Sequence, residues 1–331
     1  MTEPVPATTL FPEYPIEIAF PDLLPYAAGN SGIAYLYTFD SGKPGPHVMI
    51  NALTHGNEVC GAIVVKHLLD LQLRPRQGKL TLSFANIEGY GRFDPAKPDA
   101  SRFIDQDFNR VWTAAKLDDS SQDSVELRRA RLMRPVIDSV DLLLDIHSMH
   151  ERSAPLIVSG PLEKGIALAR QLAIPQHVIS DVGHPEGRRM RDYEDFGNPE
   201  SGKNALLIEC GQHWERAAVD VAQYSTARFL LLAGLITQDD LPTTWWPEES
   251  APSIVVEVTE PVVARSMAFQ FAGNYTGLEH FPEAGTLIGW DQVDGEKVEI
   301  RTPYPDCVLV MPSLRQLRPG VTVVRLGRIV K

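Results

Sequence analysis

Short apolar runs alternate with longer helical patterns through the first two thirds of the chain, and this alternation constrains the fold more than any other feature of the sequence. Buried strands are expected at residues 47–53, 80–86, 140–146 and 205–210. Helices are expected at residues 59–73, 123–137, 162–172 and 216–235. Strands and helices in alternation predict an α/β domain with a largely parallel sheet, in which ligands bind at the carboxyl ends of the strands.

The pattern changes near residue 248. From Ile254 onward the chain has short β-rich runs separated by Gly and Pro, without a helical pattern. A chain of 331 residues is longer than one typical hydrophobic core requires. We therefore expect an α/β domain over residues 1–248 and a small all-β domain over residues 249–331.

Composition excludes several classes of partner. The formal net charge of −12, from 31 basic and 43 acidic side chains, disfavours broad contact with nucleic acid or anionic membranes. Three widely spaced cysteines suggest neither a disulfide framework nor a cysteine zinc site. The N-terminus lacks the basic start of a signal peptide, and the apolar stretch from Phe229 is too short to span a bilayer. These features predict a cytoplasmic protein that is not embedded in a membrane.

The first candidate site is the segment "THGNE", which follows a predicted buried strand. His55 and Glu58 lie on the turn between this strand and a predicted helix, where both side chains can point at one atom. Taken alone, this pair is weak evidence for a metal site, because Glu58 could simply complement the dipole of the helix that follows.

His147 strengthens the metal hypothesis, since it ends another apolar run, "DLLLDIH". Two histidines and one carboxylate leave a fourth position open, as in catalytic zinc sites that activate a water. Asp145 lies two residues before His147 on the same side of the strand and is expected to orient a ligand. The alternative is that His147 is a hydrogen-bonded histidine at a strand end.

Two further candidate sites are a carboxylate at the end of a predicted buried strand and a segment with two arginines. Glu209 ends the apolar run "NALLIE", where a buried carboxylate needs a partner or a function, and burial would raise its pKa toward the range of a general base. In "SRFIDQDFNRVW", Arg102, Asn109 and Arg110 could bind an anionic substrate. Alternatively, Glu209 is a structural acid paired with an arginine. Arg102 and Arg110 could likewise be surface residues paired with neighbouring aspartates.

The four ordered motifs "HGNE", "RFIDQDFNR", "DIHS" and "IECG" resemble those of the succinylglutamate desuccinylase and aspartoacylase family, within the zinc carboxypeptidase superfamily. The resemblance implies a three-layer αβα domain with a mixed, largely parallel sheet and a small β-barrel-like C-terminal domain. It also implies one Zn²⁺ ion per chain, held by His55, Glu58 and His147.

The same resemblance implies roles for the remaining residues. Glu209 matches the family's catalytic glutamate, and Arg102 matches the arginine that polarises the scissile carbonyl. Asn109 and Arg110 match the pair that grips a substrate carboxylate. The implied activity is that of a zinc-dependent amidohydrolase, a deacylase acting on C–N bonds other than peptide bonds in a small anionic N-acyl amino acid or related amide.

The sequence departs from the family pattern in the segment before Glu209. "FGNPESGKNA" contains no arginine where the aspartoacylase branch reads the distal carboxylate of the acyl group. The upstream run "GHPEGRRMRDYEDFG" offers Arg188, Arg189 or Arg191 instead, and we take Arg191 as the candidate substrate contact. The identity of the acyl group therefore stays open: aspartate, succinate, acetate or another chain.

Some nearby residues receive weaker assignments. Tyr275 and Tyr304 are candidate substrate contacts from the C-terminal domain. His150, His184 and His213 are expected to line the pocket or lie at the surface rather than bind metal. The C-terminal domain has no lysine of the carrier type, so we expect it to shape the pocket or to form a homo-oligomer.

Two alternatives to a small-amide deacylase remain. One is a metallocarboxypeptidase that trims peptides, and the other is a non-catalytic protein that binds a metal or small molecule. A C-terminal domain that covers the cleft would exclude peptides, and metal content would separate an enzyme from a binding module.

Overall fold

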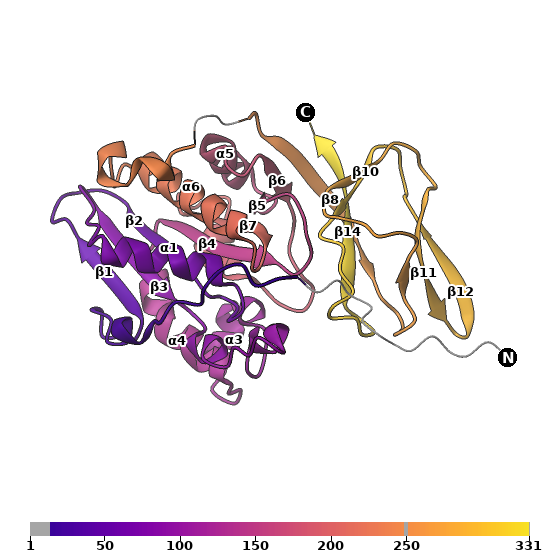
Figure 1. Ribbon diagram of the computed structural model, residues 1–331, viewed down its shortest axis with the longest axis horizontal. Helices are drawn as coiled ribbons and strands as arrows, with labels where there is room; N and C mark the ends of the chain where they lie inside the picture. Colours follow the sequence, from indigo (N-terminus) through magenta and orange to yellow (C-terminus); the bar gives the residue numbers. More distant parts are fainter. Residues whose placement is uncertain (1–13, 248–250, 331) are drawn as a thin grey trace.

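A computed structural model describes residues 14–247 and 251–330 (Figure 1). Within these residues one long sheet has eleven strands in the order β1-β3-β2-β4-β7-β5-β6-β8-β14-β13-β10. The first seven along the chain are β1 (Leu36–Asp40), β2 (His47–Ala52), β3 (Lys79–Phe84), β4 (Leu142–Met149), β5 (Leu156–Val158), β6 (His177–Ser180) and β7 (Asn204–Gln212). The helices are α1 (Val59–Asp70), α2 (Ile87–Tyr90), α3 (Ala114–Asp118), α4 (Val125–Ile137), α5 (Glu163–Leu172) and α6 (Arg216–Leu232).

The centre of the sheet is parallel, as the alternation of strands and helices predicts. Strands β3, β2, β4 and β7 run parallel to one another, whereas β1 at the edge and β5 beside β7 are antiparallel. The sequence analysis did not identify β1, β5 and β6. Strands β5 and β6 contain three and four residues, too few to give a recognisable alternation, and most of β1 is only partly buried at the edge of the sheet.

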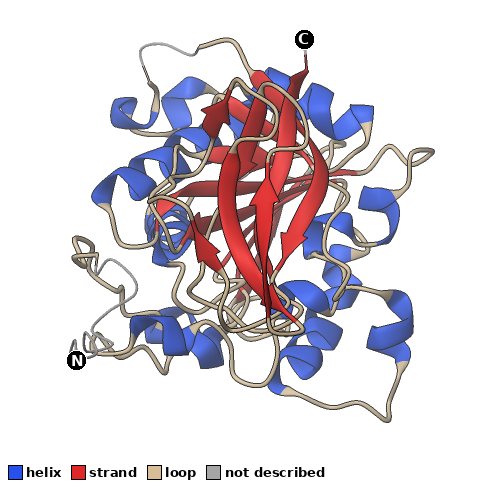
Figure 2. Ribbon diagram, turned by 90° about the vertical axis from the view of Figure 1, so that its right-hand side faces the viewer, coloured by secondary structure: helices blue, strands red, loops and turns tan. Residues whose placement is uncertain are grey.

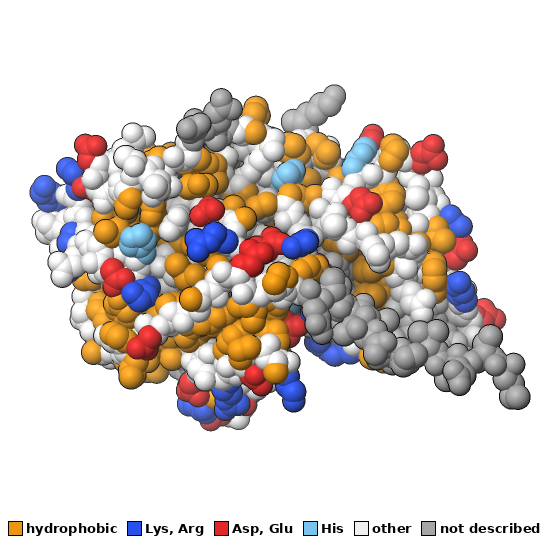
Figure 3. Space-filling view, viewed as in Figure 1, with side chains coloured by type: hydrophobic (Ala, Val, Ile, Leu, Met, Phe, Trp, Pro, Cys, Tyr) orange, Lys and Arg blue, Asp and Glu red, His pale blue; other side chains and the backbone are white. Residues whose placement is uncertain are grey.

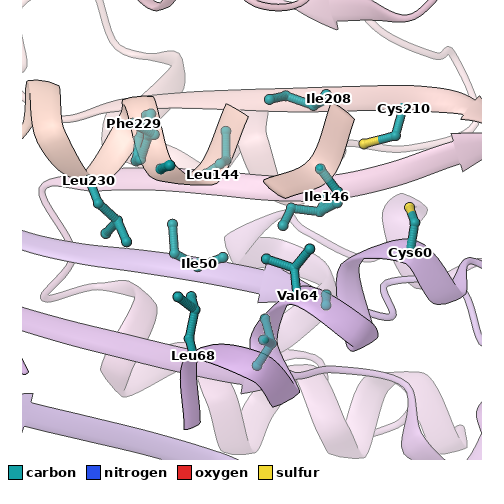
Figure 4. Packing of buried hydrophobic residues seen from close by; sticks show 14 of the residues in the cluster. Ile50, Cys60, Val64, Leu68, Leu144, Ile146, Ile208, Cys210, Phe229 and Leu230 are labelled. Atoms are coloured by element: carbon teal, nitrogen blue, oxygen red, sulfur yellow. The ribbon is translucent and has the colours of Figure 1, made fainter. Parts of the chain in front are cut away.

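Helices cover both faces of the parallel strands. Helices α1, α5 and α6 pack on one face, and α4 packs on the other. Successive strand residues alternate between the two cores: Ile50 and Leu144 belong to the first, whereas Met49 and Leu143 belong to the second. Figure 4 shows the first core, with side chains of the strands facing α1 and α6; they include Ile50, Leu144, Ile146, Ile208, Val64, Leu68, Phe229 and Leu230.

Helix boundaries depend on local capping. Helix α4 begins at Val125, two residues after the predicted start, because the Ser124 hydroxyl accepts a hydrogen bond from the Leu127 amide at 3.0 Å. Helices α1 and α6 end three residues earlier than predicted, at Asp70 and Leu232. In both cases the predicted range had included apolar residues of the turn that follows.

The C-terminal strands extend the same sheet and also form a second one. The remaining strands are β8 (Ile254–Val263), β9 (Gln270–Phe271), β10 (Glu279–Phe281), β11 (Leu287–Val293), β12 (Glu296–Arg301), β13 (Cys307–Val310) and β14 (Thr322–Val330). Strand β8 pairs in parallel with β6, and β14, β13 and β10 follow it in antiparallel order. Strands β12, β11 and β9 form the smaller sheet. The region is β-rich as predicted, and the predicted boundary at residue 248 lies outside the described residues.

The two β regions share a hydrophobic contact. Met149, Val158 and Leu207 from the first region pack with Val256 and Val310 from the second. Figure 2 shows the C-terminal strands stacked in front of the central sheet, with helices around it. This contact places the loops after β13 next to the carboxyl ends of β4 and β7.

The surface agrees with the mixed charge of the sequence. Acidic and basic side chains are interspersed over the face drawn in Figure 3. Among the described helices, none combines the length and the apolar character needed to cross a bilayer.

Leu144→Ala should lower the free energy of unfolding by about 2–5 kcal/mol, because Leu144 is fully buried between the sheet and its helices. The matched control is Leu132→Ala on α4, where the side chain is 59% exposed and the change should stay within about 0.5 kcal/mol. Equilibrium denaturation of both variants measures the difference. Equal losses in the two variants would contradict the assigned core.

Candidate metal centre and active site

The candidate residues gather where the parallel strands end. Strand β2 ends at Ala52, and its neighbour β4 carries His147 near its own carboxyl end. Strand β7 lies on the other side of β4, and Glu209 is the register partner of His147. The topology therefore brings three segments that are far apart in sequence to one edge of the sheet.

The turn between β2 and α1 depends on Gly56. A Cβ atom at this position would overlap the Ser101 carbonyl oxygen and the backbone of Gly89 and Tyr90. The Gly56 amide donates a hydrogen bond to the Arg102 carbonyl oxygen at 3.0 Å. Glycine thus lets the loop that carries Arg102 lie directly against the turn that carries His55 and Glu58.

His55, Glu58 and His147 converge on one point. His55 Nδ1 lies 2.7 Å from Glu58 Oε1, and His147 Nδ1 lies 2.7 Å from Glu58 Oε2. One ligand atom from each of the three residues lies within 4.8 Å of the others, and all three residues are buried. Two imidazole nitrogens and one carboxylate, all buried and converging on one point, fit a divalent cation.

A carboxylate holds the opposite nitrogen of each histidine. Asp145 Oδ2 lies 2.8 Å from His147 Nε2, and its Oδ1 accepts hydrogen bonds from Asn51 and Thr54. Asp107 Oδ1 lies 3.0 Å from His55 Nε2. Such contacts fix the orientation of each ring, so both Nδ1 atoms face Glu58.

The network sets the charges of its members. Burial alone would raise the pKa of Glu58, but the facing His55 and His147 hold it well below its usual range. Burial would likewise lower the pKa of His147, yet Asp145 and Glu58 raise it well above the usual value. Without a cation, His147 is therefore positively charged beside an ionised Glu58, and a cation would replace its proton.

Arg102 joins the same network. Its Nη1 lies 3.2 Å from Glu58 Oε1, and its Nη2 lies 3.1 Å from Asp107 Oδ2. Burial opposes the charged form of the guanidinium, but Asp107 and Glu58 outweigh it and raise the pKa of Arg102. Arg102 is thus a fixed positive charge at the wall of the site.

Glu209 has the opposite character. Desolvation by burial, followed by the charge of Glu58, raises its pKa from 4.5 to about 8. Its Oε2 has no hydrogen-bond partner among the described residues. A carboxyl group in this state can gain and lose a proton near neutral pH.

Apart from Arg191 and the two candidate tyrosines of the C-terminal region, the predicted site residues line a single cavity of about 180 Å³. They are His55, Glu58, Arg102, Asn109, Arg110, His147 and Glu209. Burial lowers the pKa of Arg110 to about 10, and its Nε has no hydrogen-bond partner among the described residues. Asn109 accepts a hydrogen bond from the Met190 amide at 2.8 Å, which orients its side chain.

Arg191, predicted as a substrate contact, does not line this cavity. Its guanidinium is buried away from the cavity, donating hydrogen bonds to the carbonyl oxygens of Ser159 and Ala205 at 2.7 and 3.0 Å. Arg189 from the same segment lines the cavity instead. Tyr275 and Tyr304 are likewise absent from the cavity lining.

The cavity includes a charged group of which the sequence analysis named Arg189 and His184 but not Asp181 and Arg325. Asp181 Oδ2 lies 3.1 Å from Arg189 Nη1 and 3.4 Å from Arg325 Nε, and Arg325 Nη2 lies 2.7 Å from His184 Nδ1. Arg325 comes from β14, and no local sequence signal connects it with the motifs. Asp107 was also missed as a partner of His55, although it lies inside a motif that had been noted.

The mixed, largely parallel sheet, with helices on both faces and a cavity at its strand ends, defines an α/β fold. Residues 44–234 match the model of the succinylglutamate desuccinylase/aspartoacylase catalytic domain. The chain belongs to this family.

Solved structures share the fold. A succinylglutamate desuccinylase/aspartoacylase from Rhodobacter sphaeroides has 19% sequence identity and a TM-score of 0.64, with 87% of each chain covered. A succinylglutamate desuccinylase from Vibrio cholerae has 16% identity and a TM-score of 0.65, covering 90% of this chain and 86% of its own. The ectoine utilization protein EutE (DoeB) from Ruegeria pomeroyi has 14% identity and a TM-score of 0.62, covering 91% of this chain and 92% of its own. A search of curated protein sequences found no match.

The raised pKa of Glu209 makes the stability of the metal-free protein depend on pH. Between the ordinary value of 4.5 and about 8, the folded chain keeps a proton that the unfolded chain releases, so this contribution to stability is lost as pH rises. Glu209→Gln cannot ionise. Relative to wild type, it should gain stability between pH 5 and pH 8, with a slope of at most about 1.4 kcal/mol per pH unit.

Chemical denaturation in the presence of a chelator measures this difference at both pH values. Glu200→Gln, at an exposed position, is the matched control. A difference between Glu209→Gln and wild type that does not change with pH would contradict the raised pKa.

Proposed function

We propose that the protein is a zinc-dependent deacylase that hydrolyses the amide bond of a small anionic N-acyl amino acid or related amide. The observation that carries the proposal is the convergence of His55, Glu58 and His147 with Glu209 and Arg102 in one cavity. Family membership supports the same reaction class, since succinylglutamate desuccinylase and aspartoacylase give the family its name.

His55, Glu58 and His147 would hold one zinc ion. A zinc ion bound there would supply a Lewis acid that polarises a carbonyl group and makes a water more acidic. Asp145 and Asp107 keep both imidazole rings oriented for this role through their contacts with the Nε2 atoms.

Glu209 acts as the general base and then as the general acid. Its ionised carboxylate accepts a proton from the attacking water, and its protonated form delivers that proton to the departing amine. Burial keeps the free energies of the two forms close near neutral pH, which suits a group that must exist in both.

Two arginines and one asparagine complete the chemistry. Arg102, fixed by Glu58 and Asp107, is placed to stabilise the negative charge that develops on the carbonyl oxygen. Arg110 and Asn109 bind a substrate carboxylate. Arg110 Nε lies 3.7 Å from Glu186 Oε2 and has no hydrogen-bond partner among the described residues, so it can donate to such a ligand.

The shape of the cavity favours a small amide over a peptide. Residues of the C-terminal region, including Met311, Ser313 and Arg325, line the cavity together with the strand ends of the α/β region. A wall of this kind limits the length of a ligand, which argues against the carboxypeptidase alternative. The raised pKa of Glu209, about 8, argues for catalysis rather than a non-catalytic binding module.

We also propose that residues 1–248 form the catalytic domain and residues 249–331 the β-rich domain, and that the protein acts in the cytoplasm. The change from α/β to all-β structure supports the division. A homo-oligomer built through the C-terminal region is compatible with the proposal.

Glu209→Gln should lower kcat by about 10²- to 10⁴-fold, because the variant cannot accept a proton from water. It should retain zinc at the level of the wild type, since Glu209 is not one of the three converging ligands. Steady-state kinetics and metal analysis of the same preparation test both outcomes. Full activity in the variant would remove Glu209 from the reaction, and absence of metal from the wild type would favour a binding module.

The substrate class is tested with a panel of N-acetyl, N-succinyl and N-aspartyl amino acids against C-terminal dipeptides. The acylated amino acids should be hydrolysed faster, and Arg110→Gln should raise KM for them by about tenfold or more by removing a charge-assisted contact. Lys116→Gln, a nearby cation outside the cavity lining, is the matched control. Dipeptide hydrolysis at an equal or higher rate would support the carboxypeptidase instead.

A further inference from the structure

A second group of metal-type side chains lies beside the proposed active site. It consists of Asp99, His150 and His213, and one ligand atom from each lies within 4.8 Å of the others. His150 Nδ1 lies 3.1 Å from Asp99 Oδ1 and 3.2 Å from His213 Nε2. This group shares no residue with His55, Glu58 and His147.

The atoms that face away from this point are also held. Ser148 Oγ lies 2.8 Å from His213 Nδ1, and Gln316 Nε2 lies 3.2 Å from His150 Nε2. Arg315 Nη1 lies 3.3 Å from Asp99 Oδ2. Each candidate ligand thus has a partner on its far side, the arrangement that orients ligands in metal sites.

The distances at this point are not explained by hydrogen bonds alone. His150 Nδ1 lies within hydrogen-bond distance of both Asp99 Oδ1 and His213 Nε2. An imidazole nitrogen offers either one N–H or one lone pair, so His150 Nδ1 can form a linear hydrogen bond with one of these neighbours but not with both.

We propose that Asp99, His150 and His213 bind a second divalent cation of the zinc type. A cation at this point would accept one lone pair from each of the three facing atoms. Two imidazoles and one carboxylate are a ligand set that suits zinc, cobalt or nickel better than magnesium or calcium. This assignment departs from the sequence analysis, which expected His150 and His213 to line the pocket or lie at the surface.

The site has an opening for a cation. A surface pocket next to the active-site cavity is lined by Asp99, His150, Arg102 and Gln316, among others. His150 lines both this pocket and the main cavity. His213 is fully buried, and the side chain of Asp99 is 39% exposed, so the ligand set runs from the interior to the pocket.

The second cation would join segments that meet only in the folded chain. Asp99 lies in the short turn Pro98–Ser101 directly before Arg102, His150 follows β4, and His213 follows β7. Gln316, from the loop after β13, contacts the same group. A bound cation would therefore hold the Arg102 loop against two strand ends and the C-terminal region, as a positioning site rather than a catalytic one.

Metal content tests this site independently of the proposed deacylase activity. Full-length protein stripped with a chelator, loaded with Zn²⁺ and freed of excess metal should contain two equivalents per chain by elemental analysis. Asp99→Asn, a nearly isosteric change at a partly exposed side chain, should reduce the content to one equivalent. His184→Asn, a cavity histidine outside both groups, is the matched control and should retain two equivalents.

Further variants separate the two sites and guard against misfolding. Glu58→Gln should remove the other equivalent and keep the one at Asp99, so each site is measured without the other. His150→Asn should behave as Asp99→Asn does, and circular dichroism of the stripped proteins shows whether each variant folds. In the Co²⁺-loaded protein, Asp99→Asn should remove part of the visible absorption.

One equivalent in the wild type that is lost in Glu58→Gln and kept in Asp99→Asn would overturn the second site while leaving the proposed function standing. One equivalent that is lost in Asp99→Asn and kept in Glu58→Gln would support the second site and remove the zinc centre of the proposed function.

Discussion

The ionised Glu58 carboxylate, buried between two imidazoles, is the constraint on which the rest of the site depends. A charge taken out of water costs several kcal/mol unless other charges and hydrogen bonds surround it. His55 and His147 surround this one, and they in turn require Asp107 and Asp145 on their opposite nitrogens. The site is therefore a network of alternating carboxylates and imidazoles, and its members cannot be placed independently of one another.

The parallel sheet holds the members of this network in place, because neighbouring strand ends are rigid positions. The register of β2, β4 and β7 fixes the heights of Asp145, His147 and Glu209 relative to one another. Gly56 then allows the Arg102 loop to approach the turn without a gap. Backbone geometry sets the distances first, and side-chain chemistry then decides which group carries charge.

Much of this arrangement could be predicted from the sequence, since apolar runs that end in His or Glu mark strand ends. That pattern located the central strands and the residues at their ends, His55, Glu58, His147 and Glu209. The main helices were located by their own helical pattern. Strands β5 and β6 escaped notice because they are too short to show a period. Arg191 was predicted to contact the substrate but lies outside the cavity lining. A run of arginines in the sequence does not show which side chain faces the cavity and which binds buried carbonyl groups.

Long-range pairing was the other limit on prediction. Arg325 and Gln316 reach the site only because β8 joins β6 and draws β14 and β13 alongside it. Nothing in the local sequence of β14 connects it with motifs that lie more than a hundred residues earlier. The C-terminal contribution to the cavity follows from the order of strands and could not be read from the composition of the tail.

The pairing of β6 with β8 also determines whether the α/β region can be produced without the C-terminal region. A chain cut near residue 250 would leave β6 with a row of unsatisfied backbone N–H and C=O groups, and it would expose the apolar surface formed by Met149, Val158 and Leu207. An open strand edge next to an apolar patch invites self-association. The α/β region of this chain is therefore a poor choice for isolated expression, even though it contains all four motifs.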